Sequence, residues 1–359
     1  MKVAENQPLD RLNTFGISAR AGMVITIETE EDLLSAPGLD PAHDFVLGGG
    51  SNVLFVTDVP GIVYLNRIRG IAIIGDNPEG ILLEVGAGEN WHELVAWSVA
   101  RGFSGIENLA LIPGLAGAAP LQNIGAYGVE LASVLDSVTA WDWHTATWVV
   151  LSKQQCLLGY RDSLFKTMQP DRYLITSIRL ILKKHFTAQV TYSGLAAELE
   201  SSSSGGTGLT DVFAAVIRLR RKKLPDPAVI GNAGSFFKNP LLPAALYQQL
   251  HDRFPALPSW DAGGPGIKVS AAWLIEHCDL KGFAMNGAAV SGQHALVLVN
   301  QGHCSGLAVW ELAQLVQAKV WDTFGERLEP EPKIFRCAEV GSDSMPGSSN
   351  GQSGLICAE

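Results

Sequence analysis

The chain has 359 residues, about two to three times the usual size of one domain, so the sequence predicts at least two domains with large cores. Its 47% hydrophobic and 17% charged residues are ordinary for globular proteins and exclude a mainly disordered chain. The net charge of -10, from 36 acidic against 26 basic residues, argues against a general binder of nucleic acids or anionic membranes. That charge is still compatible with one small anionic ligand held in a local basic pocket.

The first third of the chain predicts short strands and short helices separated by glycine. Thr29 has the side chain of a helix N-cap, and Asp32 stands at the third helical position, where its carboxylate completes a capping box. Asn90 opens a second helix, which ends at Arg101 and the following glycine. The strands expected in this part of the chain are residues 23–28, 45–47, 53–56 and 81–85.

The serine- and glycine-rich residues 201–208 form the one internal low-complexity stretch, and we expect a domain boundary there. Thr210 is expected to cap a helix that ends in a cluster of arginines and lysines at 218–223. Cations in the last turn complement the helix dipole, so most of this cluster is interpreted as a stabilised C-terminus. The later elements expected are helices at 271–279 and 307–323 and a strand at 294–300.

The N-terminus MKVAENQPLD lacks the apolar core of a secretory signal, and we expect a cytoplasmic protein. The longest uncharged stretch, residues 108–129, contains two prolines and four glycines and would make a poor bilayer helix. The cysteines are scattered without a C-x-x-C motif, which favours free thiols in a reducing compartment. Residues 339–359 are rich in glycine and serine and are interpreted as a disordered tail.

Three glycine-rich loops are the first candidates for chemistry. The loop at 48–52 lies between two predicted strands, where successive backbone N–H groups can bind an anion. Glycine there allows positive φ and close approach of a phosphate, although a plain hairpin turn has the same composition. The loops at 113–120 and 125–128 strengthen the cofactor interpretation. Residues 86–91 do not match a dinucleotide fingerprint, because Trp91 stands where its third glycine is required, so we exclude a Rossmann site.

Three polar segments are the next candidates: residues 159–163 with Arg161, residues 231–239 with Ser235, and residues 328–333 with Glu331. Each has an ordinary structural interpretation as well, since arginines lie along apolar surface, serines form turns and carboxylates are usually solvated. The two His-Cys doublets place neighbouring side chains on different faces, so no metal is assigned. The sequence also lacks a nucleophile elbow and a P-loop.

Together these segments resemble the UDP-N-acetylenolpyruvoylglucosamine reductase family. The resemblance runs in family order from about residue 13 to Ile334, and residues 223–240 are its longest and most specific part. Tyr192, within Thr191-Tyr-Ser-Gly-Leu195, resembles the marker of the subfamily that covers its substrate with a tyrosine loop. The segments that carry the resemblance are residues 13–16, 48–52, 108–114, 122–128, 159–163 and 223–240.

The resemblance implies an α+β protein in which an FAD-binding domain of the vanillyl-alcohol-oxidase type spans 14–185. An α+β substrate-binding domain at 205–336 and a disordered tail at 338–359 are expected to follow. NADPH would reduce non-covalently bound FAD, which would reduce UDP-N-acetylglucosamine enolpyruvate to UDP-N-acetylmuramate for peptidoglycan synthesis. We expect a cytoplasmic monomer with no nucleic-acid partner and no membrane insertion.

The resemblance also implies site residues. Arg161 and Glu331 would polarise the enolpyruvyl carboxylate, with Glu331 needing a raised pKa, and Ser235 would protonate C2. The substrate would be held by Tyr160, Tyr192, Lys223, Asn239 and His294, the last at a position where the family has glutamine. FAD would be held by Gly48, Gly49, Gly50, Ser51, Asn52, Pro113, Gly114, Gly117, Gln122, Asn123, Gly125, Tyr127 and Gly128.

A side chain at Gly50 is expected to block the FAD pyrophosphate while sparing the fold. Two other classes of function stay open at this point. One is a flavin oxidase acting on a sugar alcohol, which would consume oxygen without NADPH. The other is a flavin-binding protein without turnover, against which the presence of Arg161, Ser235 and Glu331 counts.

Overall fold

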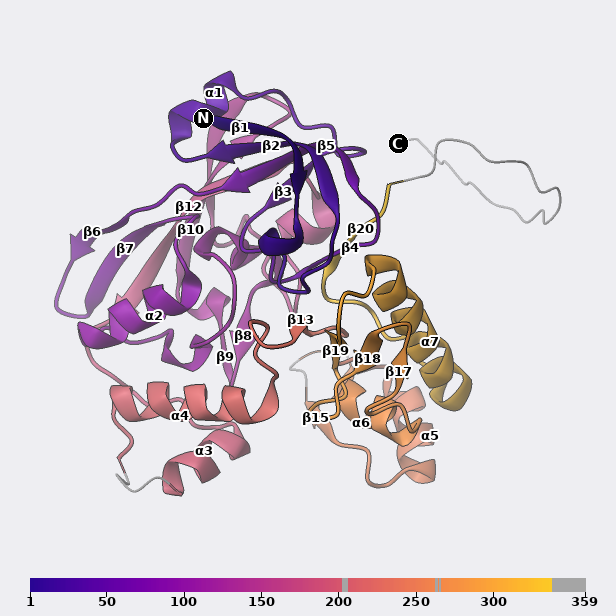
Figure 1. The fold of residues 1–359 in the computed structure, drawn as a ribbon. Helices are drawn as coiled ribbons and strands as arrows, with labels where there is room; N and C mark the ends of the chain where they lie inside the picture. The colour runs from indigo at the N-terminus through magenta and orange to yellow at the C-terminus, as the bar shows by residue number, and fades with distance from the viewer. Residues whose placement is uncertain (202–205, 262–263, 265, 338–359) are drawn as a thin grey trace, which may run out of the picture.

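The computed structural model describes residues 1–201, 206–261, 264 and 266–337. Figure 1 shows two lobes, with the first two thirds of the chain in one and the orange and yellow C-terminal part in the other. The tail expected at 338–359 lies outside the described residues. Among the described helices, none combines the length and the apolar character that crossing a bilayer takes.

The first lobe contains two large sheets. The four-stranded sheet is mixed: β1 pairs antiparallel with β2, while β2, β5 and β3 run parallel. The five-stranded sheet is entirely antiparallel. In spatial order the strands are β1 (Lys2–Pro8), β2 (Arg20–Ile27), β5 (Val59–Asn66) and β3 (Phe45–Leu47), then β11 (Thr147–Ser152), β10 (Leu135–Asp142), β12 (Tyr173–Lys183), β7 (Gly80–Gly86) and β6 (Ile71–Asp76).

The helices of this lobe begin at the caps that their sequences encode. The Asp32 carboxylate accepts a hydrogen bond from the Thr29 N–H at 3.2 Å, which closes the capping box expected for α1 (Glu30–Ser35). The Asn90 side chain accepts from the Glu93 N–H at 3.0 Å at the start of α2 (Trp91–Ala100). Short 3-10 helices and a π-helix connect the strands: η1 (Asp10–Leu12), η2 (Glu107–Leu109), η3 (Ala116–Ala118), η4 (Pro120–Gln122), η5 (Leu131–Ser133) and the π-helix η6 (Leu164–Met168).

The second lobe packs small sheets against three helices (Figure 1). Helices α6 and α7 and strand β19 lie where the sequence predicts two helices and a strand between them. The elements are β13 (Gly231–Ser235), β19 (Val297–Asn300), β18 (Ala288–Val290) and β17 (Ala284–Met285), a three-stranded sheet of β14 (Leu241–Leu242), β16 (Ile267–Val269) and β15 (Ser259–Asp261), and helices α5 (Ala244–Arg253), α6 (Ala271–His277) and α7 (Gly306–Phe324).

Helix α4 (Leu209–Lys223) differs from the expectation in two ways. Its N-cap is Gly208 rather than Thr210, because the Asp211 carboxylate accepts from the Gly208 N–H at 3.0 Å. Its buried side chains, with those of α3 (Ser193–Glu200), join the core of the antiparallel sheet in the first lobe. This packing separates α4 from the rest of the region 205–336, and we propose a domain boundary after α4.

The two lobes share one core cluster, and the end of the chain joins them. Buried side chains of the four-stranded sheet and of the second lobe pack together in that cluster. Strand β20 (Lys333–Phe335) then leaves the second lobe and pairs in parallel with β4 (Val53–Phe55), with Lys333 opposite Val53. Since β4 directly follows the glycine loop at 48–52, this pairing brings Glu331 back to that loop.

Candidate active site

A cavity of about 480 Å³ lies between the lobes, and all three glycine-rich loops contribute to its wall. Arg161, Ser235 and Glu331 line it as well, although they are far apart in the sequence. Of the residues implied for the cofactor, those that line the cavity are Gly48, Gly49, Gly50, Ser51, Asn52, Pro113, Gly117, Gln122 and Gly125. The first lobe supplies most of this wall, and the C-terminal part of the chain closes it with Ala233, Gly234, Ser235, Glu331 and Lys333.

The loop at 48–52 lies against the backbone of two other segments. A Cβ at Gly49 would lie 2.9 Å from the Gly114 Cα, and the Ser51 hydroxyl donates to the Pro113 carbonyl at 2.9 Å. Gly50 has φ +65, and a Cβ there would fall on the Leu12 carbonyl oxygen. The expectation that a side chain at Gly50 spares the fold is therefore wrong, because the protein itself occupies that space.

Gly48 differs from its neighbours. It does not have a left-handed φ, and the nearest atom to a Cβ built there is the Ala118 Cβ at 3.8 Å. The protein alone therefore does not require glycine at this position. A ligand that lies against the loop backbone would require glycine at position 48, since a methyl group there would hold the ligand away from the backbone. This position, the neighbouring backbone N–H groups and the adjoining apolar wall fit a cofactor such as FAD.

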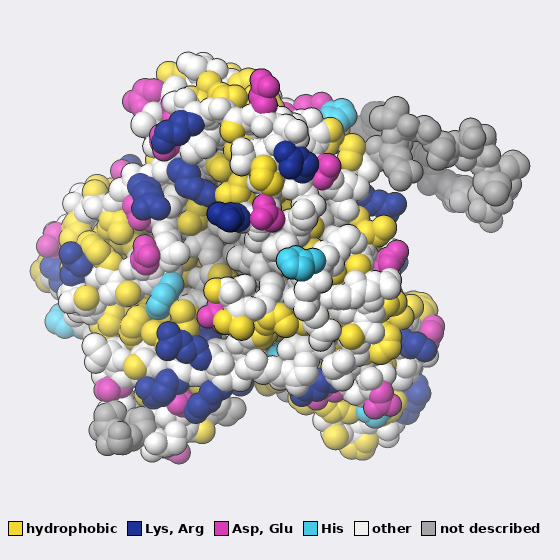
Figure 2. Space-filling view, viewed as in Figure 1, with side chains coloured by type: hydrophobic (Ala, Val, Ile, Leu, Met, Phe, Trp, Pro, Cys, Tyr) yellow, Lys and Arg dark blue, Asp and Glu magenta, His cyan; other side chains and the backbone are white. Residues whose placement is uncertain are grey.

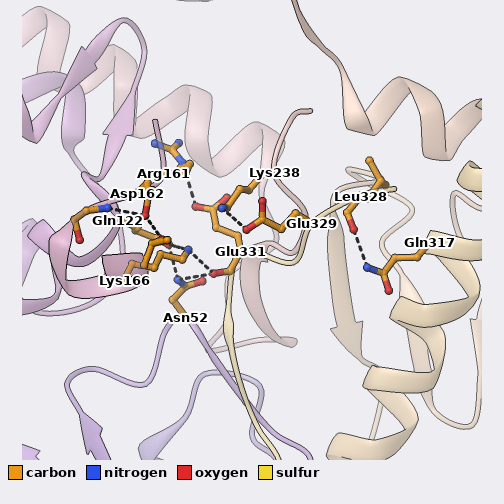
Figure 3. A network of polar contacts seen from close by, with 12 residues as sticks. Asn52, Gln122, Arg161, Asp162, Lys166, Lys238, Gln317, Leu328, Glu329 and Glu331 are labelled. Atoms are coloured by element: carbon orange, nitrogen blue, oxygen red, sulfur yellow. Dashed lines mark hydrogen bonds and ion pairs between the residues drawn. The ribbon is translucent and has the colours of Figure 1, made fainter. Parts of the chain in front are cut away.

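Arg161 and Glu331 form an ion pair in the wall of the cavity (Figure 3). The Arg161 Nε lies 3.1 Å from the Glu331 Oε1, and both side chains are largely buried, at 21% and 13% exposure. Arg161 also donates from Nη2 to the Gly125 carbonyl at 2.8 Å, so the third glycine loop orients its guanidinium. Its φ of +53 is unusual for arginine and places local backbone strain in the cavity wall.

Burial raises the pKa of Glu331, although three cations lower it: Arg161, Lys166 and Lys238, in decreasing order. The 3.1 Å ion pair favours the charged carboxylate, but removal from water outweighs it, so we take the upward shift as the net direction. The carboxyl therefore holds its proton at a higher pH than an exposed glutamate. This agrees with the raised pKa expected for its role beside a substrate carboxylate.

Ser235 ends strand β13 at the cavity wall. The β13–β19 pairing changes register between Asn232 and Ser235, and Gly234 has φ +71. The Asn232 side chain supports this bulge by accepting from the Gly234 N–H at 2.9 Å. β-Bulges re-aim the side chains that follow them. The bulge thus positions Ser235, while Phe236 and Phe237 behind it are buried in the shared core.

The structure brings together four of the residues implied for substrate and cofactor. The Lys223 ammonium donates to the Tyr192 hydroxyl at 2.9 Å and lies 5.1 Å from the centre of its ring. Tyr127, which was expected at FAD, packs edge-on against Tyr192 at 5.2 Å. His294 is near enough for the charge of Lys223 to lower its pKa, after the larger effect of burial. The hydrogen bond between Lys223 and Tyr192 thus joins these residues in one cluster of Tyr127, Tyr192, Lys223 and His294.

Tyr160 and Asn239 are not part of the cavity lining; Tyr160 lies beside Arg161, and the backbone of Asn239 hydrogen-bonds to Tyr160. The Arg161 guanidinium carbon lies 5.5 Å from the centre of the Tyr160 ring, and burial raises the pKa of this tyrosine. The Asn239 Oδ1 accepts from the Ala271 N–H at 3.0 Å, at the start of α6. The side chain of Asn239 is therefore fixed by the helix that it caps.

Three of the residues implied for FAD support the loops from behind rather than line the cavity. The buried Asn123 side chain donates to Glu130 and to the Gly159 carbonyl and accepts from Ala132, which occupies it with the protein. A Cβ at Gly114 would lie 2.8 Å from the Ser51 Oγ, and one at Gly128 would lie 2.9 Å from the Thr191 Oγ1. These positions restrict side-chain size in order to pack the loops.

Three cations at the cavity were not singled out from the sequence: Arg220, Lys166 and Lys333. Arg220 lines the cavity and donates from Nε to the Leu111 carbonyl at 3.2 Å. Arg218 and Lys222 on the same helix instead pair with Glu198, so the basic helix end has two faces. Figure 2 shows Lys and Arg side chains on the surface over the region of α3 and α4. Lys166 lines the cavity from η6. Lys166 lies three residues after Ser163, the last residue of the polar segment 159–163. This proximity was the sequence signal that could have identified Lys166 as a site residue.

Comparisons with known proteins agree with this arrangement. Residues 22–152 match the model of an FAD binding domain, and residues 226–335 match that of the UDP-N-acetylenolpyruvoylglucosamine reductase C-terminal domain. A UDP-N-acetylenolpyruvoylglucosamine reductase of Xanthomonas oryzae is 44% identical over 338 residues, covering 93% of this chain and 96% of that protein. One of Paraburkholderia xenovorans is 44% identical, covering 90% and 95%.

Among solved structures, the UDP-N-acetylenolpyruvylglucosamine reductase of Thermus caldophilus aligns with 94% of this chain and 100% of its own. The TM-score is 0.66 at 27% identity. Together with the mixed strands and helices described above, these matches confirm the expected α+β fold class with an FAD-binding domain first.

Proposed function

The chain belongs to the UDP-N-acetylenolpyruvoylglucosamine reductase family, and from that premise we propose that it reduces UDP-N-acetylglucosamine enolpyruvate to UDP-N-acetylmuramate. FAD and NADPH are the redox partners in this proposal, and the product serves peptidoglycan synthesis. One observation carries it beyond family membership. Arg161, Glu331 and Ser235 converge on one cavity whose wall is built by the glycine loops of the FAD-binding region.

When bound, FAD would supply the hydride-transfer chemistry, from NADPH to the enolpyruvyl carbon. The chain's own residues hold the cofactor and order the reacting groups around it. The open space at Gly48 and the loop at 48–52 support pyrophosphate binding along the backbone. Asn52 and Gln122 are fixed beside that loop by the 2.9 Å hydrogen bond from the Asn52 Nδ2 to the Gln122 Oε1.

Arg161 and Glu331 would bind the carboxylate of the substrate. Negative charge spreads onto this carboxylate and C2 when hydride reaches C3, and a fixed guanidinium stabilises it in a site with little water. Arg161 is suited to this because Gly125 and Glu331 already hold it. Burial raises the pKa of Glu331 and so favours its protonated form, and a protonated carboxyl would donate a hydrogen bond to the substrate rather than repel it.

Ser235 would deliver the proton to C2. A serine hydroxyl is a weak acid, but the carbanion-like carbon that receives the proton is a strong base. The bulge in β13 directs Ser235 toward the cavity that Arg161 and Glu331 also line. This placement supports protonation from one side of the substrate.

Lys223, Tyr192 and His294 would hold the UDP part of the substrate. The Lys223 ammonium is a compact cation suited to a diphosphate, and the Tyr192 hydroxyl beside it offers a further hydrogen bond. Burial and, after it, the charge of Lys223 lower the pKa of His294, which favours the neutral ring with a single N–H donor. Its Nδ1 accepts from the Leu296 N–H at 3.3 Å, which leaves Nε2 as the donor.

We further place the enzyme in the cytoplasm as a monomer. Cys156, Cys278 and Cys304 have free thiols, which suits a reducing compartment. Light scattering of the purified protein tests the oligomeric state, and a dimer mass at low concentration would reject the monomer.

Absorbance of the purified protein tests the proposed reaction. A flavin band should be bleached by NADPH under anaerobic conditions and restored by UDP-N-acetylglucosamine enolpyruvate, with UDP-N-acetylmuramate as product. Arg161→Met is the matched control, because it removes the guanidinium and keeps a long side chain. This variant should be bleached by NADPH and recover only slowly. A protein that takes up no FAD, or whose reduced flavin is restored by oxygen alone, would contradict the proposal.

A further inference from the structure

Lys166 belongs to a closed ring of polar contacts that connects the glycine loop to the segment carrying Glu331 (Figure 3). The Lys166 Nζ donates to the Gln122 Oε1 at 3.3 Å and to the Glu331 carbonyl oxygen at 3.2 Å. The Asn52 Nδ2 donates to the same two acceptors, at 2.9 and 3.4 Å. Two donors and two acceptors from four different segments thus meet in one place.

The four residues of this ring come from parts of the chain that only the fold brings together. Asn52 ends the glycine loop, Gln122 ends η4, Lys166 lies in the π-helix η6 and Glu331 precedes β20. π-Helical turns are rare and occur frequently at functional sites. Here the turn is capped by Ser163, whose hydroxyl accepts from the Phe165 N–H at 3.2 Å and donates to the Leu121 carbonyl at 2.6 Å.

The ring lies next to the Glu331 carboxyl. The ionisable groups that act on this carboxyl are Arg161, Lys166, Lys238 and Tyr160. Arg161 pairs with it directly, whereas Lys166 contacts the backbone carbonyl of the same residue. Lys238 pairs with the exposed Glu329 instead. Of the two lysines, only Lys166 therefore combines a nearby positive charge with a contact to Glu331 itself.

We infer that Lys166 is a positioning residue for reduction of the enolpyruvyl group, and this inference rests on the proposed function. Its ammonium links the Glu331 segment to Gln122, which the glycine loop also contacts through Asn52, and it adds a positive charge near the Glu331 carboxyl. In this proposal Lys166 acts through Glu331 and does not itself transfer a proton. Loss of its charge should raise the pKa of Glu331, because a cation that favours the carboxylate is removed.

Lys166→Met is the main test, because methionine nearly preserves the length and volume of the half-buried side chain. The Asn52 Nδ2 still donates to both acceptors in this variant, so neither is left without a hydrogen bond and the fold should persist. Anaerobic stopped-flow absorbance of the flavin-loaded enzyme should show bleaching by NADPH near the wild-type rate. Restoration by the enolpyruvyl substrate should slow by about 10-fold to 100-fold, as displaced catalytic groups typically cause.

Infrared spectroscopy provides a readout apart from activity. The carboxyl band that disappears in Glu331→Gln reports the protonation of Glu331, and this band should titrate at higher pH in Lys166→Met than in the wild type. Lys166→Arg keeps the charge and should retain the wild-type titration. Lys238→Met removes a nearby charge without a contact to the Glu331 backbone, so it should move the titration and slow restoration far less.

Lys153→Met is the neutral control, because Lys153 is exposed and directly follows the edge strand β11. It should leave both rates and the titration unchanged. The inference is overturned if Lys166→Met keeps the wild-type restoration rate and Glu331 titration, or if both half-reactions slow equally as the melting temperature falls. Failure of the wild type itself to be restored by the substrate would instead reject the proposed function.

Discussion

Substitutions at neighbouring glycines separate the needs of the cofactor from those of the fold. Gly48 and Gly49 are adjacent in the loop and both line the cavity. We expect Gly48→Ala to weaken FAD binding without loss of stability, and Gly49→Ala to destabilise the protein even before FAD is added. The difference follows from what each new methyl group would meet.

The magnitudes follow from the local distances. At Gly48 the nearest atom to the added Cβ is 3.8 Å away, an ordinary contact, and loss of unfolded-state freedom favours alanine by about 0.4–1 kcal/mol. At Gly49 the Cβ would lie 2.9 Å from the Gly114 Cα, which is backbone and cannot rotate away. Overpacking of this kind costs about 1–3 kcal/mol. The two variants should therefore differ in unfolding free energy by about 1.4–4 kcal/mol.

Thermal or urea unfolding of the flavin-free proteins measures this difference, and titration with FAD measures binding. Gly48→Ala should melt at or above the wild-type temperature and bind FAD at least about tenfold more weakly, a loss of about 1.4 kcal/mol. Wild-type FAD affinity in Gly48→Ala would remove the loop backbone from the cofactor site. A Gly49→Ala protein as stable as the wild type would show that the contact with Gly114 relaxes easily, against the steric argument.

Three further predictions concern residues of the proposed site. Ser235→Ala should be bleached by NADPH near the wild-type rate and then restored by substrate about 10²–10⁴-fold more slowly in stopped-flow absorbance, and equal slowing of both steps would make Ser235 a packing residue. Lys223→Met should raise the KM for the UDP substrate, whereas Lys222→Met, which removes the ion pair with Glu198, should not. Glu331→Gln should be more stable than the wild type at neutral pH: the raised native pKa makes the wild type lose stability as pH rises above about 4.3, and glutamine lacks that loss. Melting curves of both proteins that stay parallel across this pH range would contradict the raised pKa.

Local signals were sufficient for elements whose ends carry their own hydrogen-bonding groups. The caps at Thr29 and Asn90 are correct because each side chain acts within three residues of itself. The cap of α4 was misplaced because Thr210 is followed by Asp211, which binds the Gly208 N–H and starts the helix earlier. The apolar face of α4 was recognised, but which lobe it packs against depends on partners distant in sequence.

The same distinction between local signals and distant contacts applies to the candidate site. The glycine loops and the segments with Arg161, Ser235 and Glu331 could be singled out from composition and resemblance, and all of them reach one cavity. The roles of Gly50 and Asn123 in supporting the fold could not, because the atoms that restrict them, such as the Leu12 carbonyl, belong to other segments. Arg220 was not predicted as a cavity residue, because the helix dipole already explained the cations at the end of that helix.

The segment Asn13-Thr-Phe-Gly16 carried part of the family resemblance without an evident role, and the hydrogen bonds supply one. The Thr14 N–H donates to the Gly50 carbonyl at 2.9 Å, and the Thr14 hydroxyl donates to the Asn232 carbonyl at 2.7 Å. Thr14 thereby connects the glycine loop to the strand that ends in Ser235.

On the far side of the cavity, the Glu331 N–H donates to the Phe236 carbonyl at 2.8 Å, and the Lys333 N–H donates to the Asn52 carbonyl at 3.0 Å. The loop, Ser235 and Glu331 are consequently joined in a closed circuit of backbone contacts through Thr14, Phe236 and β20. Each of these segments is held by hydrogen bonds to two others, so its position does not depend on a single bond. Preorganisation of this kind suits the proposed site, in which a proton donor and a charge-stabilising pair would act on one substrate.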